Sequence, residues 1–182
     1  GGYRPRRSNA KDQAESPDLS QIANWPLGEV VEEKEFQTGE NGTTELSFNL
    51  KEGAFQAVLE TQDRFGKPVR GRLQIKVIDP DADHLALKIP FLFAAPKWSV
   101  EPGEEFVAVW GSGYDDARAY IEIERERKIV KAFWTDPKAT QVKVTYPVTE
   151  ELRGGFTIRC TMVRENRAYV EARRVDVPWT NK

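Results

Sequence analysis

The chain has 182 residues, of which 39% are hydrophobic, enough to bury the core of one sandwich or barrel or of two smaller modules. Lysine and arginine number 27 against 29 aspartate and glutamate residues, so the net charge of -2 does not supply the basic excess that nucleic-acid phosphates require. The composition therefore argues against disorder throughout and against a nucleic-acid partner.

The cysteine count and the apolar runs say little about the cellular compartment of the protein. Cys160 is the only cysteine, so no internal disulfide can form, and the count favours neither an oxidising nor a reducing environment. The chain begins at Gly1 and its only methionine is Met162, so we expect a piece of a longer polypeptide, with any signal peptide or anchor outside it. The longest apolar run, around residues 90–96, is far too short to span a membrane, and we expect no direct membrane contact.

Residues 1–27 are predicted to be a tail or linker. They contain Arg4, Arg6 and Arg7 and show almost no periodic apolar pattern before Ile22 and Trp25. Three arginines are too few to create a basic recognition surface, so a loosely docked linker is the favoured interpretation.

Residues 28–80 are predicted to form a first β module of four strands. "GEVVEEKEFQT" is followed by an "NG" pair, which supplies the positive φ values of a tight hairpin, and then by "TTELSFNL", in which Leu46, Phe48 and Leu50 share one face. The runs "AFQAVLETQ" and "VRGRLQIKV" continue the pattern on either side of the turn "DRFGKP". A proline and three aspartates in "DPDADH" then mark a module boundary.

Residues 85–180 are predicted to form a second β module. Seven short strands are separated by turns rich in glycine, proline and asparagine, as in an antiparallel sandwich. The predicted strands are 85–94, 104–110, 117–125, 128–135, 140–148, 155–164 and 168–177. The predicted fold is therefore all-β, with two consecutive antiparallel β-sandwich modules of the macroglobulin or fibronectin-III kind.

The first module is short for such a sandwich, because four strands are fewer than the roughly seven of a complete one. Either the tail supplies the missing strands or the chain begins inside a domain. In the second case an exposed sheet edge should promote self-association.

The charged stretch "YIEIERERKIVKAFW" is predicted to be a hairpin and not a helix. From just before this stretch, apolar residues recur at every second position, at Ala117, Ala119, Ile121 and Ile123, and the tip is expected near Glu126 and Arg127. Val130, Ala132 and Trp134 return along the second strand. The glutamates should face lysines and arginines across the strands, at about 0.2–1 kcal/mol a pair.

His84 is the only histidine and therefore the only candidate for a Ser/His/Asp base. It follows Asp83 in the predicted linker, and the sequence has no G-x-S-x-G motif, so an ordinary surface histidine is favoured over catalysis.

Asp79, Asp81 and Asp83 have the first three spacings of an EF-hand loop, but His84 and Pro90 occupy its sixth and twelfth positions. An irregular calcium site that clamps the two modules remains open beside the favoured interpretation, a solvated acidic linker.

Other chemistry-bearing residues are also assigned structural roles. Cys160 alternates with apolar residues and is expected to be a buried, inert thiol. The glutamates around the turn after Trp98, which are Glu101, Glu104 and Glu105, are expected in solvent. The segment 111–113 is a turn, and most tryptophans are expected in the core. No catalytic residue, cofactor or metal site is therefore predicted.

The second module carries a family resemblance. "WSVEPGEEFVAVWGSGYDDARAYIEIER" and "YPVTEELRGGFTIRC" resemble a macroglobulin-type domain of the bacterial α2-macroglobulin proteins. The first module is similar in its progression "TGENGTTELSFNLKEGAFQAVLETQDRFGKPV". The residues that carry the match are Pro102, Gly103, Glu104, Gly113, Tyr114, Ala117, Glu124, Pro147, Gly154 and Gly155.

The resemblance implies a large multi-domain protein of the periplasm, cell envelope or extracellular space that traps proteases. Its sandwiches would be non-catalytic scaffold around a bait segment, in contact with neighbouring macroglobulin-like domains and, through the whole protein, with target proteases. Cys160 is followed by Thr161 and Met162, so it lacks the family's thioester motif C-x-E-Q. Residues 79–84 are expected to act as a hinge between the modules after bait cleavage.

Two other functions remain open. A surface module of the immunoglobulin or fibronectin kind would bind a glycan or a protein, and would need at least two of Trp98, Trp110 and Trp134 exposed together in a groove. A hydrolase would need His84 in a pocket beside a nucleophile.

Overall fold

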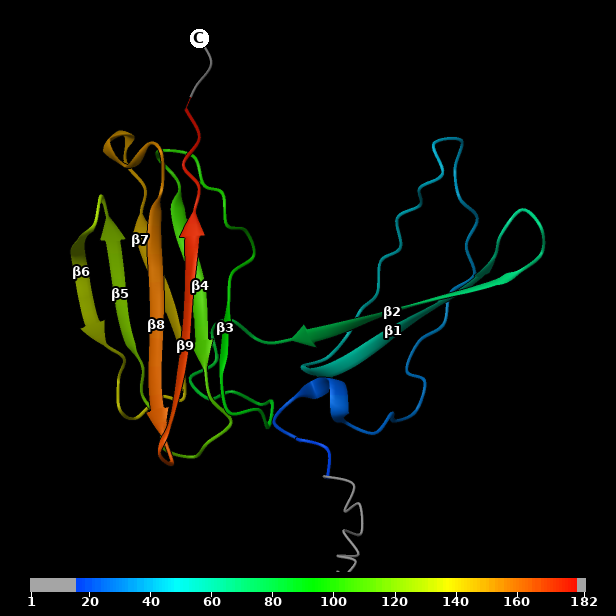
Figure 1. The fold of residues 1–182 in the computed structure, drawn as a ribbon, viewed down its shortest axis with the longest axis horizontal. Coiled ribbons are helices and arrows are strands. Elements are labelled where there is room, and N and C mark those ends of the chain that lie inside the picture. The colour runs from blue at the N-terminus through cyan, green and yellow to red at the C-terminus, as the bar shows by residue number, and fades with distance from the viewer. Residues whose placement is uncertain (1–15, 180–182) are drawn as a thin grey trace, which may run out of the picture.

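The computed structural model describes residues 16–179, and the predictions made for residues 1–15 and 180–182 lie outside this range (Figure 1). Within it the chain is all-β, and every pair of neighbouring strands in its sheets is antiparallel. No helix among these residues is long and apolar enough to cross a membrane. The elements are η1 (Ile22–Asn24), β1 (Gly53–Gln62), β2 (Pro68–Val77), β3 (Leu92–Ala94), β4 (Glu105–Gly111), β5 (Tyr120–Arg125), β6 (Lys128–Trp134), β7 (Gln141–Pro147), η2 (Glu150–Leu152), β8 (Phe156–Arg164) and β9 (Arg167–Val175).

The seven strands β3 to β9 form a sandwich of two sheets, with strand orders β3-β4-β7 and β6-β5-β8-β9. Alternate residues of each central strand point inward, since successive side chains of a strand face opposite sides of the sheet. The core contains Phe106, Trp110, Ile121, Ile123, Phe156, Ile158, Cys160 and Met162, all buried. All seven strands expected in this module are therefore present.

The hairpin predicted from alternation is confirmed. Ile121 and Ile123 are buried on β5, and the chain reverses at Glu126 and Arg127, whose φ angles of 51° and 64° are those of a type I′ turn. The residues predicted to return along β6 lie largely in solvent, because β6 is the last strand of its sheet.

The predicted charge pairs between β5 and β6 are wrong. The β6 residue opposite Glu122 is Ala132, and a shift in register between Ile123 and Glu124 brings Ile129 opposite Glu124. The opposite charge comes from the other neighbouring strand, where Arg159 of β8 lies 3.9 Å from Glu122.

The first strand of the sandwich is shorter than predicted. Only residues 92–94 pair in β3, whereas Leu85, Leu87 and Ile89 are buried in a second apolar cluster outside the sandwich core. Ile22 and Trp25 of the N-terminal segment pack against this cluster. The alternation of residues 85–89 therefore reflects burial beneath η1 and not strand pairing.

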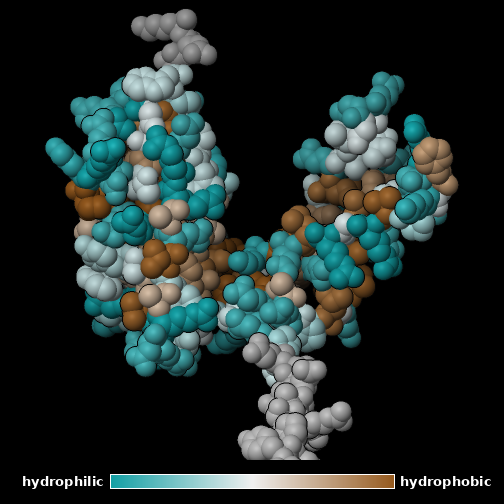
Figure 2. Space-filling view, in the orientation of Figure 1, coloured by the Kyte–Doolittle hydropathy of each residue, from teal (hydrophilic) through white to brown (hydrophobic). Residues whose placement is uncertain are grey.

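The first module contains one two-stranded hairpin, β1–β2, within the described residues. Its turn is confirmed, as is the turn around Gly42, where φ is 74° and the Gly39 N–H donates to the Thr43 carbonyl at 2.9 Å. The two strands predicted within residues 29–50 are not formed. Figure 2 shows hydrophobic residues gathered over this half of the molecule, and Leu59, Val69 and Leu73 on the hairpin are all exposed.

The segment between the modules is attached to the second one. Gln141, at the start of β7, is buried, and its side-chain Nε2 donates to the carbonyls of Asp79 at 2.5 Å and Ala82 at 3.1 Å. The backbone N–H groups of Thr140 and Gln141 both donate to the Asp83 carbonyl. The predicted hinge segment 79–84 is thus hydrogen-bonded to the sandwich, while the Asp79 N–H also donates to the Glu52 carboxylate of the first module at 2.9 Å.

Candidate functional site

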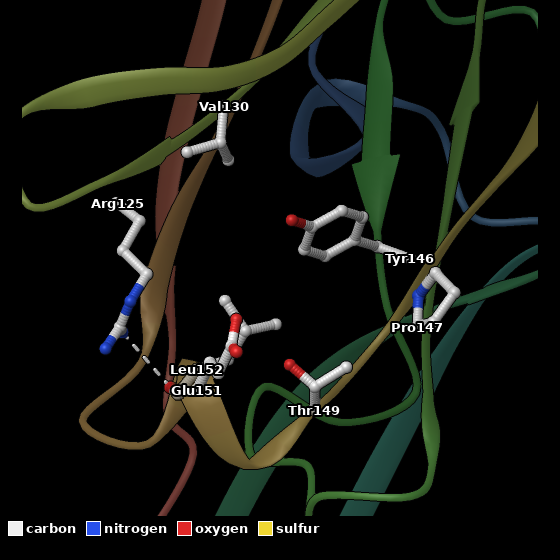
Figure 3. Close-up of a pocket in the computed structure, with 7 residues that line it drawn as sticks. All are labelled: Arg125, Val130, Tyr146, Pro147, Thr149, Glu151 and Leu152. Atoms are coloured by element: carbon white, nitrogen blue, oxygen red, sulfur yellow. Dashed lines mark hydrogen bonds between the residues drawn. The ribbon is translucent and has the colours of Figure 1, made fainter.

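A pocket of about 390 Å³ opens where the two sheets of the sandwich end side by side. Figure 3 shows Val130 of β6 and Tyr146 of β7 on opposite sides of it, with the turn that contains η2 below. The lining residues are Arg125, Val130, Tyr146, Pro147, Thr149, Glu151 and Leu152.

Arg125 fixes one wall of this pocket. Its guanidinium donates to the carbonyls of Leu152 at 3.2 Å, Arg153 at 3.0 Å and Gly155 at 2.7 Å, so the end of β5 is tied to the turn before β8. Gly155 has a φ of 94°, and a Cβ there would lie 2.4 Å from the Val175 carbonyl oxygen. This turn therefore needs glycine, and the pocket wall is held rigidly.

Glu150 and Arg153 reinforce the same turn. Arg153 Nε and Nη2 donate to the two carboxylate oxygens of Glu150 at 2.6 and 3.0 Å. These bonds hold the pKa of the Glu150 carboxyl below its ordinary value. The Arg153 side chain is mostly buried whereas Glu150 is exposed, so the pair faces solvent on one side only.

The opposite wall is the edge strand β6. The Lys131 ammonium lies 5.3 Å from the ring centroid of Phe133 and 5.9 Å from that of Tyr146, spanning the gap between the sheets. Ile129, Val130 and Trp134 on this strand are all about half exposed. The site therefore combines an unpaired strand edge, an apolar hollow and positive charge.

The tryptophans do not form a shared binding groove. Trp110 is fully buried, and Trp98 is half-buried between Phe106 and the Arg173 guanidinium. Trp134 is 56% exposed and packs on Tyr120, with a ring centroid separation of 5.0 Å. The condition set for a tryptophan-lined surface is therefore not met by these three residues.

His84 lies on the surface and does not line the pocket between the two sheets. Its Nδ1 is 2.7 Å from an Asp83 carboxylate oxygen. That hydrogen bond, together with the charge of His84, holds the pKa of the Asp83 carboxyl below its ordinary value. His84 is therefore an exposed side chain in contact with its neighbour Asp83.

The three linker aspartates have separate partners. Asp79 accepts a hydrogen bond from the Asp81 N–H, Asp81 pairs with Lys143, and Asp83 pairs with His84. Across residues 16–179, no group of three or more histidine, cysteine, aspartate or glutamate side chains is arranged to hold a metal ion.

Cys160 lies in the core of the sandwich, and Glu104 of the 101–105 turn is held by hydrogen bonds. Cys160 is fully buried, and this burial raises the pKa of its thiol far above the usual range. Glu104 accepts hydrogen bonds at 3.0 Å from Lys97 and from the Glu101 N–H, and these bonds lower the pKa of its carboxyl. Glu104 therefore closes the Pro102-Gly103 turn.

Sequence reasoning missed the pocket residues and Gln141. The pocket combines side chains from β5, β6, β7 and the η2 turn, and no local motif records that meeting. Gln141 lies near the start of the predicted strand 140–148. A polar residue there is common in exposed strands, so the sequence does not indicate that its side chain is buried.

No family model matches the chain, and no curated protein matches it. Among solved structures, the crystal structure of the rat CD45 extracellular region, domains d3-d4, is similar at 10% sequence identity and a TM-score of 0.29. The match covers 82% of this chain and 79% of that one. At this TM-score the assignment of the fold rests on the strand pairing described above.

Proposed function

We propose that residues 28–179 are non-catalytic scaffold modules of an α2-macroglobulin-like protein that traps proteases. The sequence resemblance suggests the family, and the attachment of the linker to the sandwich through Gln141 is the observation that best supports a scaffold role. A module whose entry segment is bound to its own sheet behaves as a rigid body. Rigid bodies transmit a rearrangement by rotating about the short segments between them.

Several residues that carry the resemblance have roles that this fold requires. Gly103 has a φ of 93°, which favours glycine, and it lies in the turn closed by Glu104. A Cβ at Gly113 would lie 2.7 Å from the carbonyl oxygens of Leu87 and Ile89, closer than real contacts allow. These roles support the proposal by explaining the pattern physically.

In this proposal the modules contact neighbouring macroglobulin-like domains of the same chain and meet target proteases only through the whole protein, in the periplasm, cell envelope or extracellular space. The pivot of this proposal is Ile78, between β2 and Asp79, and its movement has to break the packing of Ile78 and Ala54 on the second apolar cluster. Movement there would tilt the first module against the sandwich without breaking the bonds to Gln141.

The test uses the complete protein and an endopeptidase. An enclosed protease should still cleave a small chromogenic peptide but should lose most of its activity on a folded protein substrate, because only the peptide can diffuse into the enclosure. Equal loss of both activities would indicate an ordinary active-site inhibitor, and loss of neither would contradict the proposal.

A surface module that binds a glycan or protein is the second candidate. The groove of two exposed tryptophans expected for this function is not formed, and the observation that remains in its favour is the exposed Trp134 ring, with Tyr120 packed on it and the Arg118 guanidinium 4.5 Å from its centroid. Calorimetric titration with oligosaccharides, comparing the chain with Trp134→Ala, would test this function.

A further inference from the structure

We propose that the outer edge of β6 binds an extended acidic strand of a second copy of this chain, residues 29–36, by adding it to the sheet. This inference goes beyond the scaffold function and does not depend on it. It joins two segments that have no strand partner within the described residues, a strand edge and a strand-forming sequence whose Lys34 side chain contacts Ser47 and Phe48 of its own chain.

The acceptor is the free edge of β6. This strand ends the order β6-β5-β8-β9, and its sequence KIVKAFW contains two lysines and no acidic residue. Edge lysines protect a sheet against unwanted pairing, because a second β6 would bring like charges together. An acidic strand reverses that effect, so the lysines make the edge selective for negative charge.

The donor is residues 29–36, EVVEEKEF. It contains four glutamates and one lysine, and Val30 and Val31 are 81% and 67% exposed. Its β-branched residues favour a strand, yet no strand forms there in the monomer. Figure 1 shows residues 29–50 on the side of the molecule away from β6, so the donor has to come from another copy.

One antiparallel register satisfies both lysines. Lys128 and Lys131 lie opposite β5 residues that are two apart, because β6 has one extra residue at its register shift. A donor strand that follows β6 in the same way therefore needs two glutamates that are two apart, and pairing Glu33 with Lys131 and Glu35 with Lys128 meets this condition. The same register puts Val31 opposite Phe133 and brings the donor backbone along the rim of the pocket that Val130 lines.

Donor and acceptor are different surfaces, so the contact is heterologous. Two copies that exchange strands reciprocally close into a dimer, whereas one-way exchange propagates into longer assemblies. Both outcomes use the same two strands.

The experiment measures the mass of the 182-residue chain by sedimentation equilibrium from low micromolar to submillimolar concentration. The expected result is self-association that weakens with added salt. Two variants, K128E/K131E and E33K/E35K, should each weaken it by about tenfold or more, because every contact then joins like charges. Mixing the two variants should restore it, since each acceptor in the mixed pair again meets an opposite charge.

Rescue in the mixture also shows that both variants are folded, because a misfolded variant could not recover. A chain that stays monomeric throughout would overturn the proposal, and so would association that persists in K128E/K131E. Association lost in Leu73→Glu but retained in K128E/K131E would assign the contact to the exposed apolar face of the β1–β2 hairpin instead.

Discussion

At the scale of single residues, Gln141 is the polar side chain on which the attachment of the linker depends. It is 1% exposed, and its amide is the donor for the Asp79 and Ala82 carbonyls. Gln141→Leu keeps the size of the side chain but leaves these carbonyls without that donor. We expect a loss of about 1–3 kcal/mol in the free energy of unfolding.

Urea unfolding of the variant measures this loss, and hydrogen exchange of residues 79–84 should become faster at the same time. Gln74→Leu, on the exposed part of β2, is the matched control and should change the stability by less than about 0.5 kcal/mol. Unchanged exchange in the linker would contradict the role given to Gln141.

Glu104 gives the fold a dependence on pH. The hydrogen bonds from Lys97 and from the Glu101 N–H lower its pKa in the folded state below the ordinary value of 4.5. Its contribution to stability is therefore fully present above about pH 4.5 and is lost as the pH falls through the lower folded pKa.

Glu104→Gln should make the acid-induced fall in melting temperature shallower below that pH, as measured by circular dichroism. Glu105→Gln, the adjacent glutamate, is the control. If the melting temperature falls equally steeply with decreasing pH in Glu104→Gln and in the unchanged chain, the turn does not depend on the carboxylate.

At the scale of elements, the turn between β5 and β6 uses two residues that are unfavourable in it. Glu126 and Arg127 adopt positive φ angles, which non-glycine side chains resist. Glu126→Asn with Arg127→Gly supplies the preferred type I′ pair, and we expect a gain of about 0.5–1 kcal/mol.

Urea unfolding would measure this gain. Lys128→Gly, one position later in the strand, should instead lower the stability, because glycine weakens a strand interior. A neutral or negative effect of the Asn-Gly pair would mean that the Glu126 and Arg127 side chains stabilise the hairpin in some other way.

Two predicted strands, one formed and one not, show how much of the fold could be predicted from the sequence. The alternation at Ile121 and Ile123 predicted the inward face of β5, because one strand carries that information alone. The same kind of pattern at Leu46 and Phe48 did not produce a strand. A strand requires a neighbour, and side-chain periodicity does not identify one. For the same reason the pocket, which joins four segments, could not be predicted.

At the scale of the whole molecule, the two halves differ in how much apolar surface they bury. The sandwich has a closed core, whereas the β1–β2 hairpin leaves Leu59, Val69 and Leu73 exposed. Isolated two-stranded hairpins are marginally stable in water. We therefore expect the amides of residues 53–77 to exchange at least about a hundredfold faster than those of β8, as measured by mass spectrometry on the full chain. Equal protection would show that the hairpin is stabilised by contacts other than those described.

The attachment at Gln141 has one more consequence for how this junction can evolve. The amide binds main-chain oxygens, which every amino acid possesses, so substitutions at Pro80, Asp81 or Ala82 need not disturb it. Only a change at Gln141 itself or in the length of the connecting segment would do so. The composition of the junction is thus free to drift, while its spacing is constrained.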